Sequence, residues 1–139
     1  MNKGLLDTDM LSELFKGVNP SVGGNASAYR QAFGHLTLSA ITVMEIVSGL
    51  QRMQSPRRIQ KFMNNISGEE VLPFDKAAGK LAGEIAGDLE RTGQSIGIAD
   101  PMIAAVALQH GLELVTGNNA HFQRIQQLGY PLTLANWRQ

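Results

Sequence analysis

Short strand-like segments alternate with longer stretches of helical periodicity along the whole chain. Strands are predicted at residues 4–6, 35–38, 71–74 and 112–116. Helices are predicted at residues 10–15, 26–33, 41–53, 56–63, 77–91, 101–110 and 121–128, and a surface loop at residues 17–25. Parallel strands need long crossover connections, which are usually helices. We therefore expect an α/β protein with three layers, α/β/α, in which a short parallel sheet is flanked by helices.

Two residues at the ends of these elements allow more specific predictions. Pro73 cannot donate a backbone hydrogen bond, so its strand is expected at an edge or an end of the sheet. Gly111 directly follows the helix predicted at residues 101–110, where a left-handed cap is expected.

The composition excludes several classes of protein. A chain of 139 residues fits a single domain, residues 1–139, with one well-buried core. The absence of cysteine excludes disulfides, thiolate catalysis and zinc–thiolate sites. The apolar stretch before Asp7 is too short for a signal-peptide core, and no run approaches membrane-spanning length. We therefore expect a soluble, cytoplasmic protein.

The charge balance bears on nucleic-acid binding. Twelve basic and twelve acidic residues give a formal net charge of zero, so any RNA contact must depend on a local patch. One candidate patch follows the helix predicted at residues 41–53 and consists of Arg52, Arg57, Arg58 and Lys61. A solvated helix surface is the favoured interpretation, and a grip on RNA phosphates is the alternative.

The predicted sheet indicates where a site would form. In open parallel sheets, ligands bind beyond the carboxyl ends of the strands. Asp7 directly follows the first predicted strand, and Asn118 follows the strand that ends at Thr116. One of Asp7, Thr8 and Asp9 is expected to cap the following helix. We expect Asp9 or Thr8 to be the cap and Asp7 to point into the cleft.

The other candidate residues have structural interpretations of their own. Residues 42–45 match a capping box, the favoured interpretation of Glu45 from that segment alone. Asp100 before Pro101 is a good N-cap, although the preceding residues 95–99 are mostly apolar. Asn118 or Asn119 could cap the last helix, and an amide oxygen could also bind a metal ion.

Histidine and hydroxyl chemistry has little support in the sequence. His35, His110 and His121 have no metal-pair spacing and are interpreted as structural or surface residues, with a substrate role for His121 left open. Ser39 and Thr42 have no histidine base placed by a motif, so a serine hydrolase is not supported.

Carboxylates at one sheet edge favour metal-assisted hydrolysis. Such groups repel each other unless a cation neutralises them. Mg²⁺ or Mn²⁺ prefers oxygen ligands, can acidify a water molecule and can neutralise phosphoryl charge. The sequence therefore predicts hydrolysis of phosphodiester bonds at a metal site formed by Asp7, Glu45 and Asp100, with Asn118 as a fourth member.

The order of these motifs resembles PIN-domain proteins of the VapC toxin type. The matching segments are residues 5–12 (LLDTDMLS), 39–46 (SAITVMEI), 72–75 (LPFD), 96–105 (IGIADPMIAA) and 114–122 (LVTGNNAHF), followed by Trp137. The similarity spans essentially the whole chain. Each motif alone is weakly specific, whereas the ordered set is strongly specific.

The resemblance implies a PIN-like fold and a Mg²⁺-dependent endoribonuclease, the toxin of a toxin–antitoxin pair. It also implies a cognate antitoxin partner and a homodimer that assembles with the antitoxin into a larger complex. Asp7, Glu45 and Asp100 match the three acidic positions of the family. Asn118 stands where many members have a fourth acidic residue, and Asp9 stands where asparagine is usual, so Asp9 could add a ligand or a nearby charge.

Two other functions are weighed against the nuclease. Residues 5–9 also resemble the opening of haloacid-dehalogenase-type phosphatases, in which Asp7 would be the nucleophile and Asp9 the general acid. The later lysine and double-aspartate motifs of those enzymes are not recognisable here. The second alternative is a non-catalytic PIN-like module that binds RNA or a protein.

Overall fold

The computed structural model describes residues 1–139 and contains seven helices and five strands. In chain order they are β1 (Gly4–Leu6), α1 (Thr8–Lys16), α2 (Pro20–Phe33), β2 (Thr37–Ser39), α3 (Ala40–Arg52), α4 (Pro56–Asn65), β3 (Glu70–Leu72), α5 (Lys76–Arg91), α6 (Ala99–Gln109), β4 (Glu113–Val115), α7 (Asn119–Gln127) and β5 (Leu134–Ala135). The strands form one parallel sheet in the order β3-β2-β1-β4-β5. The predicted parallel sheet is confirmed.

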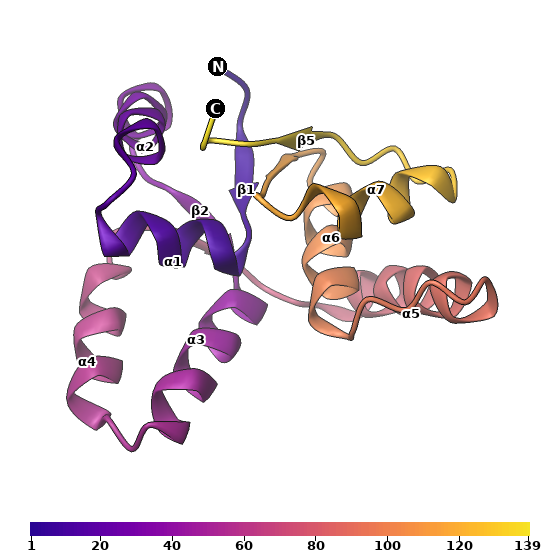
Figure 1. Cartoon of the computed structure of the whole chain (residues 1–139), viewed down its shortest axis with the longest axis horizontal. Helices are drawn as coiled ribbons and strands as arrows, with labels where there is room; N and C mark the ends of the chain where they lie inside the picture. Colours follow the sequence, from indigo (N-terminus) through magenta and orange to yellow (C-terminus); the bar gives the residue numbers. More distant parts are fainter.

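The two central strands divide the core into two layers. Successive residues of a strand point to opposite faces of the sheet. In β1, Leu5 packs with α5, α6 and α7, whereas Leu6 packs with α1, α2 and α4. In β4, Leu114 and Val115 divide in the same way. Figure 1 shows the two groups of helices on either side of β1, which confirms the three-layer α/β/α arrangement.

The segment predicted as a surface loop is mostly helical, so that prediction was wrong for residues 20–25. The Asn19 side chain caps α2 by accepting hydrogen bonds from the Ser21 and Val22 amides at 3.0 and 3.3 Å. Pro20 occupies the first turn, where its missing amide hydrogen is not needed. Val22 and Ala26 are buried, so packing compensates for the two glycines between them.

Other element boundaries follow the predictions closely. β3 lies at an edge of the sheet, as Pro73 predicted, but ends at Leu72 before the proline. β2 is shifted toward Ser39 relative to the predicted segment 35–38. Gly111 has φ 63°, the expected left-handed conformation. The short strand β5 at the other edge was not predicted. None of the helices is long and apolar enough to cross a membrane.

Candidate active site

Three strands deliver polar residues to one edge of the sheet. Asp7 follows β1, α3 begins directly after β2, and Thr116 follows β4. The backbone amide of Asp7 donates a 3.0 Å hydrogen bond to the Val115 carbonyl, which continues the pairing between β1 and β4 by one residue. The carboxyl edge of the sheet is therefore where the candidate residues lie.

Asp7 is buried and caps α1. Its side chain is 3% exposed. Oδ1 accepts a 2.8 Å hydrogen bond from the Met10 amide, and Oδ2 accepts a 2.5 Å bond from Thr116 Oγ1. The prediction that Asp9 or Thr8 caps the helix was wrong, because α1 begins at Thr8 directly after the extended Asp7. Asp9 instead lies exposed in the first turn.

The surroundings of Asp7 disfavour its ionised form. Burial raises the pKa of its carboxyl group from 3.8 to about 6, even though the hydrogen bonds from Thr116 and Met10 lower it. The negative charges of Asp9 and Asp100 raise the pKa further. A cation bound beside Asp7 would offset both the burial and this repulsion.

Glu45 is directed toward the start of α1. The predicted capping box is not formed, because α3 begins at Ala40 and Ser39 is its cap, accepting a 3.3 Å bond from the Thr42 amide. Glu45 Oε1 accepts a 2.5 Å hydrogen bond from Thr8 Oγ1. The Thr8 hydroxyl also lies 3.0 Å from the Thr42 hydroxyl. Glu45 is thus connected to the residue that follows Asp7.

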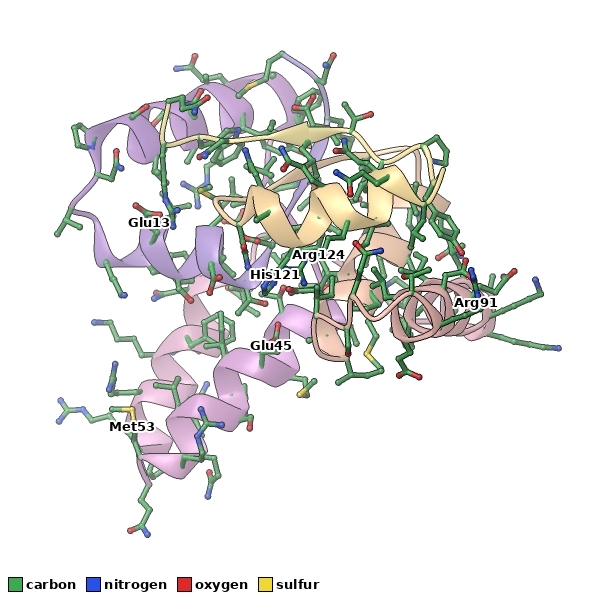
Figure 2. The ribbon with its side chains drawn as sticks, turned by 45° about the vertical axis from the view of Figure 1, so that its right-hand side comes forward. Glu13, Glu45, Met53, Arg91, His121 and Arg124 are labelled. Carbon is green, nitrogen blue, oxygen red and sulfur yellow. The ribbon has the colours of Figure 1, made fainter.

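Asp100 and Asn118 meet at His121. The interpretation of Asp100 as an N-cap was wrong, because α6 begins at Ala99 and has no side-chain cap. Asp100 Oδ2 instead lies 3.0 Å from Nδ1 of His121. Asn118 Nδ2 lies 2.9 Å from the same ring nitrogen, and Asn118 makes no side-chain cap bond to α7. In Figure 2, His121 on α7 and Glu45 on α3 face the same region of the molecule.

Sequence reasoning gave little weight to two of these partners. His121 lies three residues after Asn118, close to one helical turn, and this spacing was an available signal for their contact. Thr116 was noted only as the end of a strand. Its hydroxyl accepts a 2.9 Å bond from the Asn118 amide while it donates to Asp7, and so connects two predicted site residues.

The donor chemistry of the site fits a hard divalent cation. Asp7, Glu45, Asp100 and Asn118 offer oxygen atoms, and each carboxylate oxygen can accept more than one interaction. Asp7 and Asp100 are near enough for their charges to interact. No three His, Asp or Glu side chains lie close enough together to form a metal-binding group in this conformation. The three carboxylates would therefore have to move closer to bind one ion together.

A groove of about 640 Å³ lies between α1, α3 and α4, and Glu45 is the one candidate site residue in its lining. Thr8 and Glu45 belong to its lining, as do three residues of the predicted basic patch, Arg52, Arg58 and Lys61. Arg57, the fourth residue of that patch, is not part of the lining.

Comparison with known proteins is consistent with this geometry. Residues 5–128 match the family model of the PIN domain. The chain is 33% identical over 129 residues to the tRNA(fMet)-specific endonuclease VapC of Shigella flexneri, covering 90% of this chain and 93% of that protein. It is 36% identical over 126 residues to the VapC ribonuclease Y4jK of Sinorhizobium fredii, covering 86% and 89%.

Solved structures show the same similarity. DNA-bound VapBC from Salmonella typhimurium contains a chain that superposes with a TM-score of 0.80 at 29% identity, with 99% of each chain covered. VapBC2 from Rickettsia felis, bound to a promoter DNA fragment, gives a TM-score of 0.80 at 25% identity, covering 96% of this chain and 97% of that one.

Proposed function

This chain belongs to the PIN-domain family as a VapC-type ribonuclease toxin, and we propose that it hydrolyses RNA with a divalent cation bound by Asp7, Asp100 and Glu45. The observation that carries the proposal is the buried Asp7 carboxylate. Its pKa is raised to about 6 by burial, with Asp100 as a charged neighbour, at the carboxyl edge of a parallel sheet. Perturbed acidic groups at such an edge are typical of functional sites.

Each acidic residue has a partner that fixes its orientation. Thr116 holds one oxygen of Asp7, Thr8 holds Glu45, and His121 holds Asp100. These bonds keep the three carboxylates at one edge of the sheet, but the side chains must still move closer together, and exchange some of these partners, to bind one cation. The chemistry that Mg²⁺ or Mn²⁺ supplies when bound is acidification of water and neutralisation of phosphoryl charge. Asn118 contributes a neutral amide that can hydrogen-bond to the substrate or to water.

The solved relatives suggest the partners of the chain. They are complexes of a VapC-type protein with VapB, and we propose an antitoxin partner for this chain as well. We further propose that the protein is cytoplasmic, where its RNA substrate is, and that it forms a homodimer that assembles with the antitoxin.

The phosphatase alternative is not favoured. The PIN-domain match covers residues 5–128. Asp9, which would be the general acid of a phosphatase, is exposed in the first turn of α1, whereas Asp7 is buried and bonded to Thr116. Asp9 and Asp7 therefore lie in different environments.

The test is an RNA-cleavage assay with the purified full chain, free of antitoxin. Structured RNA is incubated with Mg²⁺ or Mn²⁺, with and without EDTA. Asp7→Asn and Asp100→Asn should each lower the cleavage rate by more than about a hundredfold, since even partners of metal ligands contribute about 10- to 100-fold. Asparagine is chosen because its oxygen can still cap α1 at position 7.

A matched control is Glu90→Gln, which removes an exposed carboxylate on α5 and should cleave like the wild type. Cleavage that survives EDTA, or that is equal in Asp7→Asn and the wild type, would refute the metal site. Turnover of a chromogenic phosphate monoester in place of RNA would favour a phosphatase. RNA binding without any cleavage would favour the non-catalytic module.

A further inference from the structure

The groove beside the active site follows one face of two helices. Its α1 side is formed by Thr8, Ser12, Phe15 and Lys16, which share a face at helical spacing. Its α3 side runs from Glu45 to Arg52 and Met53, and α4 closes it. Figure 1 shows α3 and α4 extending away from α1 on one side of the molecule. The groove therefore leads from the acidic site to the far ends of α1 and α3.

The charges along this groove are nearly all positive. Lys16, Arg52, Arg58 and Lys61 belong to its lining, and Glu45 is the only acidic residue among the fourteen that form it. The whole chain has no net charge, with twelve basic and twelve acidic residues. The positive charge is thus a local feature of the groove.

These four cations also lack carboxylate partners. Of the twelve Lys and Arg side chains, five form ion pairs within the chain: Lys3, Arg30, Lys80, Arg91 and Arg138. Four of the seven others line this single groove. Like charges placed together without counter-charges repel each other, so the arrangement is unfavourable unless an anion binds there.

An aromatic ring lies among the cations. Phe15 is 38% exposed in the groove, and its ring meets the buried ring of Phe62 edge to face at 6.1 Å. A partly exposed ring held in place by a second ring offers a surface on which a base can stack. Basic side chains along a groove that can contact successive phosphates, together with an aromatic ring that can stack on a base, are typical of proteins that bind single-stranded nucleic acids.

We propose that this groove binds the single-stranded RNA that flanks the cleaved bond, with Lys16, Arg52, Arg58 and Lys61 on its phosphates and Phe15 stacked on a base. This inference rests on the proposed nuclease function, because it gives the groove the substrate of that function. The acidic residues of the site repel RNA, so cleavage needs basic side chains nearby that bring the phosphates to the end of the groove where Glu45 lies. An acidic protein segment in the same groove would also be repelled by Glu45 at the inner end, and it carries no phosphate to be cleaved there.

The test compares two adjacent arginines of α4. Arg58 lines the groove and Arg57 does not, while both are exposed. Binding of a fluorescent single-stranded oligoribonucleotide to the full chain is measured by anisotropy in EDTA, where no cleavage occurs, over a range of salt concentrations. For single strands, the logarithm of the affinity falls with the logarithm of the salt concentration by about 0.7 for each phosphate neutralised.

Arg58→Ala should raise the Kd about fivefold at low salt and reduce this slope by about 0.7, and Arg52→Ala should do the same. Arg57→Ala should leave both within experimental error. Phe15→Leu should weaken binding without changing the slope, because stacking does not release counterions; a thermal melt checks that the variant is folded.

Two outcomes would overturn the proposal. Equal losses in Arg57→Ala and Arg58→Ala would mean that the chain attracts RNA by general charge. Unchanged RNA binding in Arg58→Ala, with weaker binding of the co-expressed antitoxin, would assign the groove to a protein partner. Because binding is measured without cleavage, either outcome leaves the nuclease function standing. Conversely, if RNA binds with the expected salt dependence but is never cleaved, the nuclease function is refuted and the proposal that the groove binds RNA still holds.

Discussion

Thr116 Oγ1 donates a 2.5 Å hydrogen bond to Oδ2 of Asp7 and thereby joins the ends of two neighbouring strands. The register of β1 on β4, in which Leu6 pairs with Val115, brings the next residue of each strand side by side. The same hydroxyl accepts a 2.9 Å bond from the Asn118 amide. One threonine therefore orients the buried carboxylate and fixes the start of the loop that leads to α7.

Thr116→Val should raise the pKa of Asp7 further above its ordinary 3.8, because the hydrogen bond from Thr116 is the largest influence that lowers it. Titration of the Asp7 carboxyl carbon, followed by NMR in EDTA, measures the change. Loss of partners for both Asp7 and the Asn118 amide should also lower the free energy of unfolding by about 1–3 kcal/mol. Thr116→Ser keeps the hydroxyl and should titrate like the wild type. A valine variant that titrates at the wild-type pH would contradict this account.

Asp7→Asn should stabilise the metal-free protein at neutral pH. The folded state raises the pKa of Asp7 from 3.8 to about 6, so it binds this proton more tightly than the unfolded chain does. The stability from this group is fully present below pH 3.8 and is lost as the pH rises through 6. At pH 7.5 the ionised carboxylate is unfavourable by about 3 kcal/mol at most, whereas asparagine carries no charge.

Urea unfolding in EDTA at pH 4 and pH 7.5 tests this prediction. The Asp7→Asn substitution should raise the free energy of unfolding at pH 7.5 by about 1–3 kcal/mol and have no stabilising effect at pH 4. An equal effect at both pH values would show that the charge of Asp7 is not the cause. A gain in stability together with lost cleavage would be the trade-off expected of a catalytic carboxylate.

Addition of a divalent cation should stabilise the wild type. This stabilisation should increase as the pH rises, whereas the stability contributed by protonated Asp7 is lost. A cation at a hundred times its Kd adds about 2.7 kcal/mol to the free energy of unfolding. Because protons compete for Asp7 with a pKa of about 6, the stabilisation by Mn²⁺ should be larger at pH 7.5 than at pH 5. Thermal melts with and without Mn²⁺ measure it. Asp7→Asn should lose this response and Glu90→Gln should keep it; the same response in both would place the ion elsewhere.

The sequence was sufficient to predict the order of helices and strands, but it was less sufficient to predict their exact bounds and local contacts. Apolar periodicity predicted the seven helices and four of the strands. β5 was missed because its two residues are too few for a period and pair only with β4, which the fold brings beside them. Residues 20–25 were predicted as a loop because glycine, proline and asparagine are typical of loops. The helix there is explained by the Asn19 cap and by the burial of Val22 and Ala26.

The partners of the site residues could not be predicted from local sequence. The sheet edge, the motif order and the choice of Asp7, Glu45 and Asp100 were available from the chain. The contacts of Thr8 with Glu45 and of Asp100 with His121 join residues 37 and 21 positions apart. Local patterns predicted caps for Glu45 and Asp100, and neither residue forms one. They favoured Asp9 or Thr8 as the cap of α1, where Asp7 is the cap. Capping and tertiary contacts compete for the same oxygen atoms, and the folded chain decides between them.

Gly4→Ala should destabilise the fold and disturb the site at the same time. A Cβ atom at Gly4 would lie 2.9 Å from Cγ2 of Val115 and 3.2 Å from the Glu113 carbonyl oxygen. β1 and β4 would have to move apart, at a cost of about 1–3 kcal/mol. Gly23→Ala in α2 is the matched control, because nothing lies within 4 Å of its Cβ position. Alanine there should instead stabilise the helix by about 1 kcal/mol.

The strand separation in Gly4→Ala would also reach Asp7, since the Asp7 amide bonds to the Val115 carbonyl at 3.0 Å. Cleavage should therefore fall together with the free energy of unfolding in Gly4→Ala and remain unchanged in Gly23→Ala. Urea unfolding and RNA cleavage measured on both variants check this. Full activity in a destabilised Gly4→Ala protein would mean that the Asp7–Thr116 contact tolerates a change in the spacing of β1 and β4.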